Sequence, residues 1–192
     1  LSYPQIFRGA GYHTGFIGKW GLGGELPVDQ FDYWDGFPGQ GKFLHEIDGK
    51  TRHLESLMGE SAAKAMRETP AGKPFCLSVS FKAPHVQDED PKQYLYDPAL
   101  EDLYQDVEIP VPATADPKYF QQLPEFVQAS EGRVRWEKRF ATPGMYQTSV
   151  KGYYRLVTGI DRAVGHMLQT LEELGQLDNT IIVYSSDNGI LN

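Results

Sequence analysis

The chain has 192 residues, enough for one domain with a hydrophobic core, and its formal net charge is -8. An acidic chain repels phosphate backbones, which argues against nucleic acid as a partner. No stretch approaches the roughly 18 consecutive apolar residues of a membrane helix, so we expect no membrane span. The oligomeric state is not readable from the sequence. The chain begins without Met and stops soon after Asp187-Asn188, and we expect it to be an internal piece of a longer protein.

Along the first third of the chain, the sequence predicts a short helix that ends near Gly9 or Gly11. A short strand follows over residues 14–20 and enters a glycine-rich loop. Residues 27–50 show no periodicity, and we interpret them as loop. Apolar residues recur at three- and four-residue steps over residues 54–69, which predicts a helix that ends at Pro70.

A second strand is predicted over residues 75–81, closing on Lys82-Ala83-Pro84-His85. The stretch from Pro84 to Pro143 holds 8 of the 13 prolines, a density that blocks long helices and central strands. We therefore expect a long surface excursion at about 86–146, with short helices near residues 117–128. Such an excursion is expected to shape a pocket, whose aromatic residues would suit the face of a sugar.

The last third of the chain carries the clearest pattern. Residues 147–174 form a strongly amphipathic helix, and Gly175 is a natural residue to follow its end. The β-branched run 180–185 is typical of a buried, parallel strand. Helix, strand, helix and strand in this order favour a three-layer α/β/α sandwich with a mostly parallel sheet, here incomplete.

Polar side chains follow each of the three predicted strands. The first strand delivers Lys19, the second Lys82 and His85, and the third Asp187 and Asn188. Ligands of open α/β sheets gather beyond the carboxyl ends of the strands, so we expect one shared site there.

Each of these residues also has an ordinary structural interpretation. Asp187 and Asn188 are hard oxygen donors suited to Ca²⁺ or Mg²⁺, yet Ser-Asp-Asn-Gly is also common turn chemistry. Lys19 is either a fixed ammonium for an oxyanion or a solvated lysine. His85 is either a general acid or a loop histidine with one local hydrogen bond. The single cysteine, Cys76, lies in an apolar run and is interpreted first as a buried strand residue rather than a nucleophile.

Taken together, three segments resemble the sulfatase family of the alkaline-phosphatase superfamily. Residues 11–23 are similar to the family's second signature, G-Y-x-T-x-x-x-G-K-W-H-L-G. The strand that ends in Pro84-His85 is similar to the family's strand ending in Pro-His. The helix, turn, strand and Ser-Asp-Asn-Gly of residues 153–189 occur in the family's order.

The resemblance implies specific roles for the residues singled out above. Lys19 would bind the sulfate, and His85 would contact the sulfate ester and assist its leaving group. Asp187 and Asn188 would bind a divalent cation, usually Ca²⁺. The substrate would be a sulfate ester, small or part of a glycan, and the location periplasmic or secreted.

Two departures from the family pattern matter. The signature histidine is Gly21 here, and the sequence holds no C/S-x-P-x-R motif, from which the family's formylglycine nucleophile is made. We therefore expect this chain alone to be inactive, while its parent protein is a sulfuric ester hydrolase. A phosphodiesterase or phosphonate hydrolase of the same superfamily, or a non-catalytic sulfatase-like binding domain, remain the alternatives.

Overall fold

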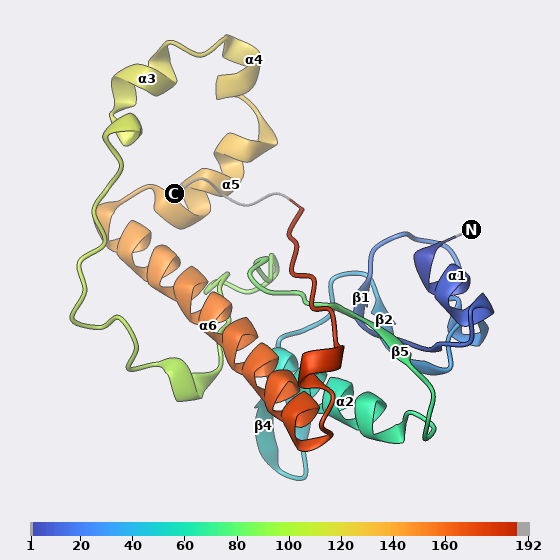
Figure 1. Ribbon diagram of the computed structural model, residues 1–192. Helices are drawn as coiled ribbons and strands as arrows, with labels where there is room; N and C mark the ends of the chain where they lie inside the picture. Colours follow the sequence, from blue (N-terminus) through green and yellow to red (C-terminus); the bar gives the residue numbers. More distant parts are fainter. Residues whose placement is uncertain (1, 188–192) are drawn as a thin grey trace.

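The structure, a computed structural model, describes residues 2–187 and is built on a three-stranded parallel sheet (Figure 1). The strand order is β2 (Tyr33–Pro38), β1 (His13–Trp20) and β5 (Phe75–Ser80). β1 lies in the centre, with Gly15 opposite Tyr33 of β2 and Leu77 of β5. The predicted strands 14–20 and 75–81 and the parallel α/β class are confirmed.

β1 is held close to its neighbours by a glycine. A Cβ atom on Gly18 would lie 2.2 Å from the Ser80 carbonyl oxygen and 2.3 Å from Met58 Cε, and the φ of Gly18 is +97°. Only glycine accepts both the conformation and the space. Gly18 therefore sets the close spacing between β1, β5 and the helix that carries Met58, next to Lys19.

Two long helices form the core with the sheet. α2 (Leu54–Glu68) packs on β1 and β5, and α6 (Pro143–Glu173) packs on α2. The two helices approach closely where a Cβ on Gly59 would meet Ala163 at 3.2 Å. α1 (Tyr3–Gly9) packs against β1. The core comes from the apolar faces of these elements, including Ile17, Met58, Ala62, Leu156 and Ile160.

α6 starts four residues before the predicted boundary, because its cap lies upstream. Thr142 Oγ1 accepts a hydrogen bond from the Met145 N–H at 3.2 Å, and Pro143 occupies the first turn. At the other end Gly175 takes a φ of +64°, as expected for the residue that closes a helix.

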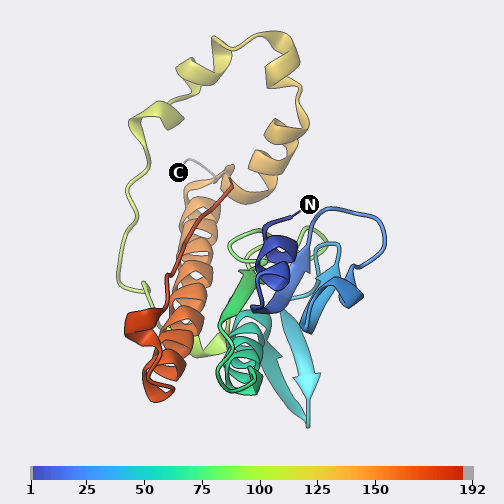
Figure 2. The same cartoon turned by 45° about the vertical axis from the view of Figure 1, so that its right-hand side comes forward.

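The proline-rich excursion arches away from the sheet and returns to α6 (Figure 2). Its regular elements are short, as predicted: η2 (Pro98–Leu100), η3 (Ala113–Ala115), α3 (Pro117–Gln121), α4 (Glu125–Gln128) and α5 (Glu131–Phe140).

Buried Arg155 of α6 fastens the first part of the excursion. Its guanidinium donates to the carbonyls of Glu101 (2.6 Å) and Leu103 (3.1 Å) and lies 4.6 Å from the centre of the Tyr96 ring. Three contacts from one side chain therefore fix a segment that has little regular structure of its own.

The prediction of loop over residues 27–50 was wrong. This segment holds η1 (Val28–Gln30), β2, and an antiparallel hairpin of β3 (Leu44–Ile47) and β4 (Lys50–His53). The hairpin turns at Asp48-Gly49, where both residues have positive φ. An Asp-Gly turn favours a hairpin, and this local signal was overlooked. β2 forms because it pairs with the edge of β1. The hydrophobic periodicity of residues 33–38 gives no indication of this pairing.

The prediction of a buried parallel strand over residues 180–185 was also wrong. After η4 (Leu177–Asn179) the chain is extended and runs back in the direction of the start of α6 in both views (Figures 1 and 2). It pairs with no strand among residues 2–187. Ile181 is 92% exposed and Val183 82% exposed. β-Branched residues favour extended backbone, but burial requires a neighbouring strand.

Candidate functional site

Two lysines meet at the carboxyl edge of the sheet. Lys19 is the penultimate residue of the central strand β1, and Lys82 follows the neighbouring parallel strand β5. Lys82 is only 2% exposed. Burial lowers the pKa of its ammonium, and the positive charge of Lys19 lowers it further. The edge therefore concentrates positive charge, which favours an anionic ligand.

One carbonyl orients two side chains of this edge. The Val86 carbonyl oxygen accepts hydrogen bonds from Lys82 Nζ at 3.2 Å and from His85 Nδ1 at 2.8 Å. A carbonyl only accepts, so Nδ1 of His85 carries the hydrogen in this arrangement. The remaining ring nitrogen, Nε2, is then the atom that can exchange a proton with a ligand. The His85 side chain belongs to an exposed residue, as that role requires.

The loop that carries Lys82 and His85 is also fixed from the hairpin side. The Lys82 ammonium lies 4.7 Å from the centre of the Phe43 ring, and Phe43 is fully buried. The Phe43 N–H donates to Gln87 Oε1 at 3.0 Å. These contacts hold the loop in place before any ligand binds.

Glu55 in the first turn of α2 is part of the same structure. It is fully buried, and its Oε1 accepts a hydrogen bond from the Ala83 N–H at 2.6 Å. The sequence analysis missed Glu55, because an acidic residue at the start of a helix is normally explained by the helix dipole. Its packing against residues about 28 positions later leaves no local signal.

The structure describes only one of the two predicted metal ligands. Asp187 is exposed in the extended segment, and no hydrogen bond or ion pair among residues 2–187 joins it to Lys19 or His85. Asn188 lies outside the described residues. Residues 2–187 contain no cluster of three or more His, Cys, Asp or Glu side chains that could hold a metal ion. The metal-ligand role of Asp187 and Asn188 therefore stays a prediction, and we derive no step through a metal.

Cys76 behaves as a structural residue. It lies half-buried in β5, and burial raises the pKa of its thiol. A thiol that resists ionisation is a poor nucleophile. The interpretation of Cys76 as a strand residue agrees with this environment.

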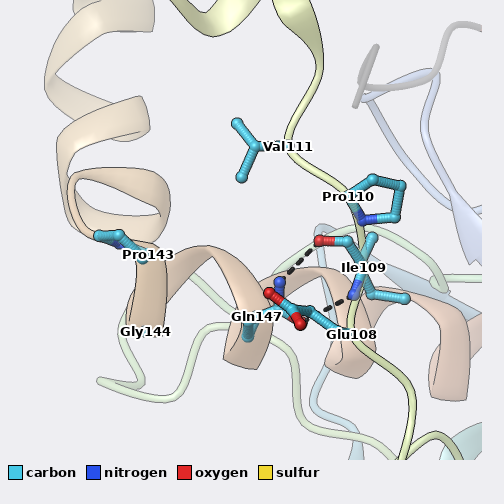
Figure 3. Close-up of a pocket in the computed structure, with 7 residues that line it drawn as sticks. All are labelled: Glu108, Ile109, Pro110, Val111, Pro143, Gly144 and Gln147. Atoms are coloured by element: carbon cyan, nitrogen blue, oxygen red, sulfur yellow. Dashed lines mark hydrogen bonds between the residues drawn. The ribbon is translucent and has the colours of Figure 1, made fainter.

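A cavity of about 550 Å³ lies between the excursion and the start of α6 (Figure 3). Gln147 of α6 joins the two sides of the cavity. Its side chain donates to the Ile109 carbonyl at 2.7 Å and accepts from the Ile109 N–H at 3.0 Å. The predicted substrate pocket with an aromatic sugar face stays a prediction, because none of the residues that line this cavity is aromatic. Neither Lys19 nor His85 lines it. The seven lining residues are Glu108, Ile109, Pro110, Val111, Pro143, Gly144 and Gln147.

The order and spacing of these residues match a known family over nearly the whole chain. The family model described as Sulfatase matches residues 2–191. The chain belongs to the sulfatase family. The resemblance of residues 11–23, with Lys19 at the carboxyl end of β1, is thereby confirmed as a family relationship.

Curated relatives and a solved structure agree with this assignment. An N-acetylglucosamine-6-O-sulfatase of Bacteroides thetaiotaomicron is 24% identical, over 98% of this chain and 44% of its own length. An ulvan-active sulfatase of Formosa agariphila is 24% identical, over 98% of this chain and 35% of its own. A protein solved in complex with its substrate, D-glucosamine-2-N,6-O-disulfate, has a TM-score of 0.65 and 22% identity, over 93% of this chain and 47% of its own.

The sulfatase chain spans less than half the length of these relatives. The structural likeness establishes the alkaline-phosphatase-like α/β fold. Enzymes of the family use a formylglycine and a metal, whereas the present sequence contains no C/S-x-P-x-R motif. None of the helices within residues 2–187 has the length and apolar character needed to cross a bilayer.

Proposed function

We propose that the full-length protein containing this chain is a sulfuric ester hydrolase that acts on a sulfated glycan. The named activities of the two curated relatives and the sulfated glucosamine bound by the structural neighbour support a sugar substrate. A periplasmic or secreted location is part of the same proposal.

The observation that carries the proposal is the position of Lys19 near the carboxyl end of β1 and of His85 in the loop after the neighbouring parallel strand β5. Lys19 and the buried Lys82 give the edge of the sheet a positive charge, which suits the oxygens of a sulfate group. The Nδ1 hydrogen bond of His85 to Val86 leaves Nε2 as the ring nitrogen that is available to a ligand. In its imidazolium form, Nε2 donates a proton to the ester oxygen as the alcohol leaves.

The metal and the nucleophile complete the proposal. Asp187 and Asn188 would contribute oxygen ligands to a divalent cation, for which we propose Ca²⁺. When bound, such a cation supplies positive charge to the sulfate oxygens. The formylglycine would have to come from a part of the protein that is not in this sequence, so the 192-residue chain alone is expected to be inactive.

The test compares substitutions in the full-length protein. Lys19→Ala and His85→Ala are each expected to lower sulfate ester turnover by about a hundredfold or more. Lys64→Ala on the exposed side of α2 and His166→Ala on the exposed side of α6 are matched controls. Near wild-type turnover in either site variant would contradict the proposed roles.

Rates on matched sulfate and phosphate esters decide between the enzyme classes. Faster turnover of the phosphate ester would replace the proposal with a phosphohydrolase. Binding of the sulfated sugar without any turnover would replace it with a binding domain.

A further inference from the structure

Glu55 and His53 form a buried pair, and each has one polar side-chain atom that faces the other without a hydrogen-bond partner. Their side chains are 0% and 1% exposed, and His53 Nδ1 lies 3.7 Å from Glu55 Oε2. Neither of these two atoms has another hydrogen-bond partner. A buried polar atom without a partner costs free energy, so the pair needs a hydrogen between the two atoms.

The other atoms of the pair are already fixed. His53 Nε2 lies 2.9 Å from the Leu95 carbonyl oxygen, which can only accept, so Nε2 carries a hydrogen. Glu55 Oε1 accepts the Ala83 N–H. If His53 were neutral and Glu55 ionised, two lone pairs would face each other across 3.7 Å. A proton on Glu55 Oε2 removes this conflict.

The surroundings decide which partner holds that proton. Burial raises the pKa of Glu55 to about 7, although the hydrogen bond from Ala83 and the charge of Lys82 oppose the rise. Burial also lowers the pKa of His53, although the hydrogen bond to Leu95 and the charge of Asp97 oppose this. Phe43 stacks on the His53 ring at 5.2 Å and keeps water away from it. The net directions favour the neutral forms, a carboxylic acid facing a neutral imidazole.

We propose that Glu55 is a positioning residue for the Lys82–His85 segment, and that it acts as a protonated acid whose Oε2 faces His53 Nδ1. The pair joins two parts of the chain. Oε1 holds the segment through Ala83, and the imidazole holds the excursion through Leu95. The consequence for catalysis rests on the proposed function, whereas the protonated state of Glu55 does not.

The first experiment tests the proton without using activity. Infrared difference spectra between the full-length protein and its Glu55→Gln variant should show a protonated carboxyl band at about pH 6 that converts to a carboxylate band at about pH 8. Glu55→Gln is suited to this comparison, because its amide can accept from Ala83 and donate to His53. Glu68→Gln, an exposed position of the same helix, should show no such band. A carboxylate band for Glu55 at about pH 6 would overturn the proposal that Glu55 is protonated.

The second experiment tests positioning through the pH dependence of kcat/KM on a sulfate ester. Ionised Glu55 turns a second acceptor towards Nδ1 and loosens the segment. The ratio of wild type to Glu55→Gln should therefore fall up to about tenfold between pH 6 and pH 8. A constant ratio, or a Glu55→Gln variant that does not fold, would overturn the positioning role. Absence of turnover by the wild type would count against the proposed function only, because the infrared result stands by itself.

Discussion

Lys82 and His85 donate hydrogen bonds to the same acceptor, the carbonyl oxygen of Val86. One peptide group thus sets the direction of a buried ammonium and of an exposed imidazole. Val86 itself is only 5% exposed, so the acceptor is held by packing. The geometry of the proposed site is therefore built into the loop after β5 and does not depend on a ligand.

Replacing Gly18 by Ala is expected to destabilise the protein by about 2–4 kcal/mol. The new Cβ would collide with the Ser80 carbonyl oxygen at 2.2 Å, and alanine does not tolerate a φ of +97°. Urea unfolding of the full-length protein measures the loss. Gly144→Ala is the matched control, because a Cβ at that helical position meets nothing within 4 Å. Equal stability of the two variants would contradict the close approach of β1 and β5.

Replacing Gly21 by His should leave the free energy of unfolding within about 0.5 kcal/mol of the wild type. A Cβ at Gly21 meets nothing within 4 Å, and its backbone is outside the left-handed region. Lack of space therefore does not explain why this chain has Gly21 in place of the family's signature histidine. Thermal unfolding checks this expectation, and a large fall in Tm would show that the glycine is structurally required.

Replacing Arg155 by Met should cost about 2–4 kcal/mol and loosen residues 96–104. The carbonyls of Glu101 and Leu103 would lose their donor, and Tyr96 would lose the guanidinium that stacks on it. Hydrogen exchange should speed up in this segment first. Arg162→Met, an exposed position on the same helix, should change neither quantity. Unchanged exchange in Arg155→Met would contradict the fastening role.

The stability of the protein should depend on pH through Glu55. Its pKa is about 7 in the folded chain against 4.5 for a free side chain, so the folded state binds more protons between these values. The free energy that Glu55 contributes is fully present below pH 4.5 and is lost as pH rises to about 7. The whole effect is roughly 3 kcal/mol.

Unfolding of wild type and Glu55→Gln at several pH values measures this contribution. His53 has the opposite sign, because a lowered pKa costs stability as pH falls, but it is present in both proteins. The stability difference between them should therefore grow as pH decreases from about 7 to about 4.5. Parallel curves would show that Glu55 does not titrate in this range.

Much of the fold was readable from local patterns. The helices around Met58 and Ile160 follow from apolar spacing, and Gly175 marks the end of α6. Lys19 and His85 were proposed because each lies at or after the end of a predicted strand, and their roles stay predictions. Contacts between distant segments were not readable. Glu55 reaches Ala83 through packing, and no spacing rule connects the two.

The wrong strand prediction has a separate physical origin. Residues 180–185 have strong β-propensity, which describes how side chains fit a sheet rather than which strand lies beside them. The hairpin at Asp48-Gly49 shows the opposite case, since its turn fixes both strands locally. Local signals therefore predict helices and extended segments, but they do not predict which strands lie side by side.

The exposed stretch 180–185 has a practical consequence for work with this chain on its own. It contains neither charge nor proline, and its backbone forms no ladder among the described residues. Such a stretch is a template to which a second copy can add as a strand. Solubility of the isolated 192-residue chain will therefore be limited by intermolecular strand addition rather than by a weak core. A single charge, as in Val183→Lys, should raise the soluble yield without touching Lys19 or His85.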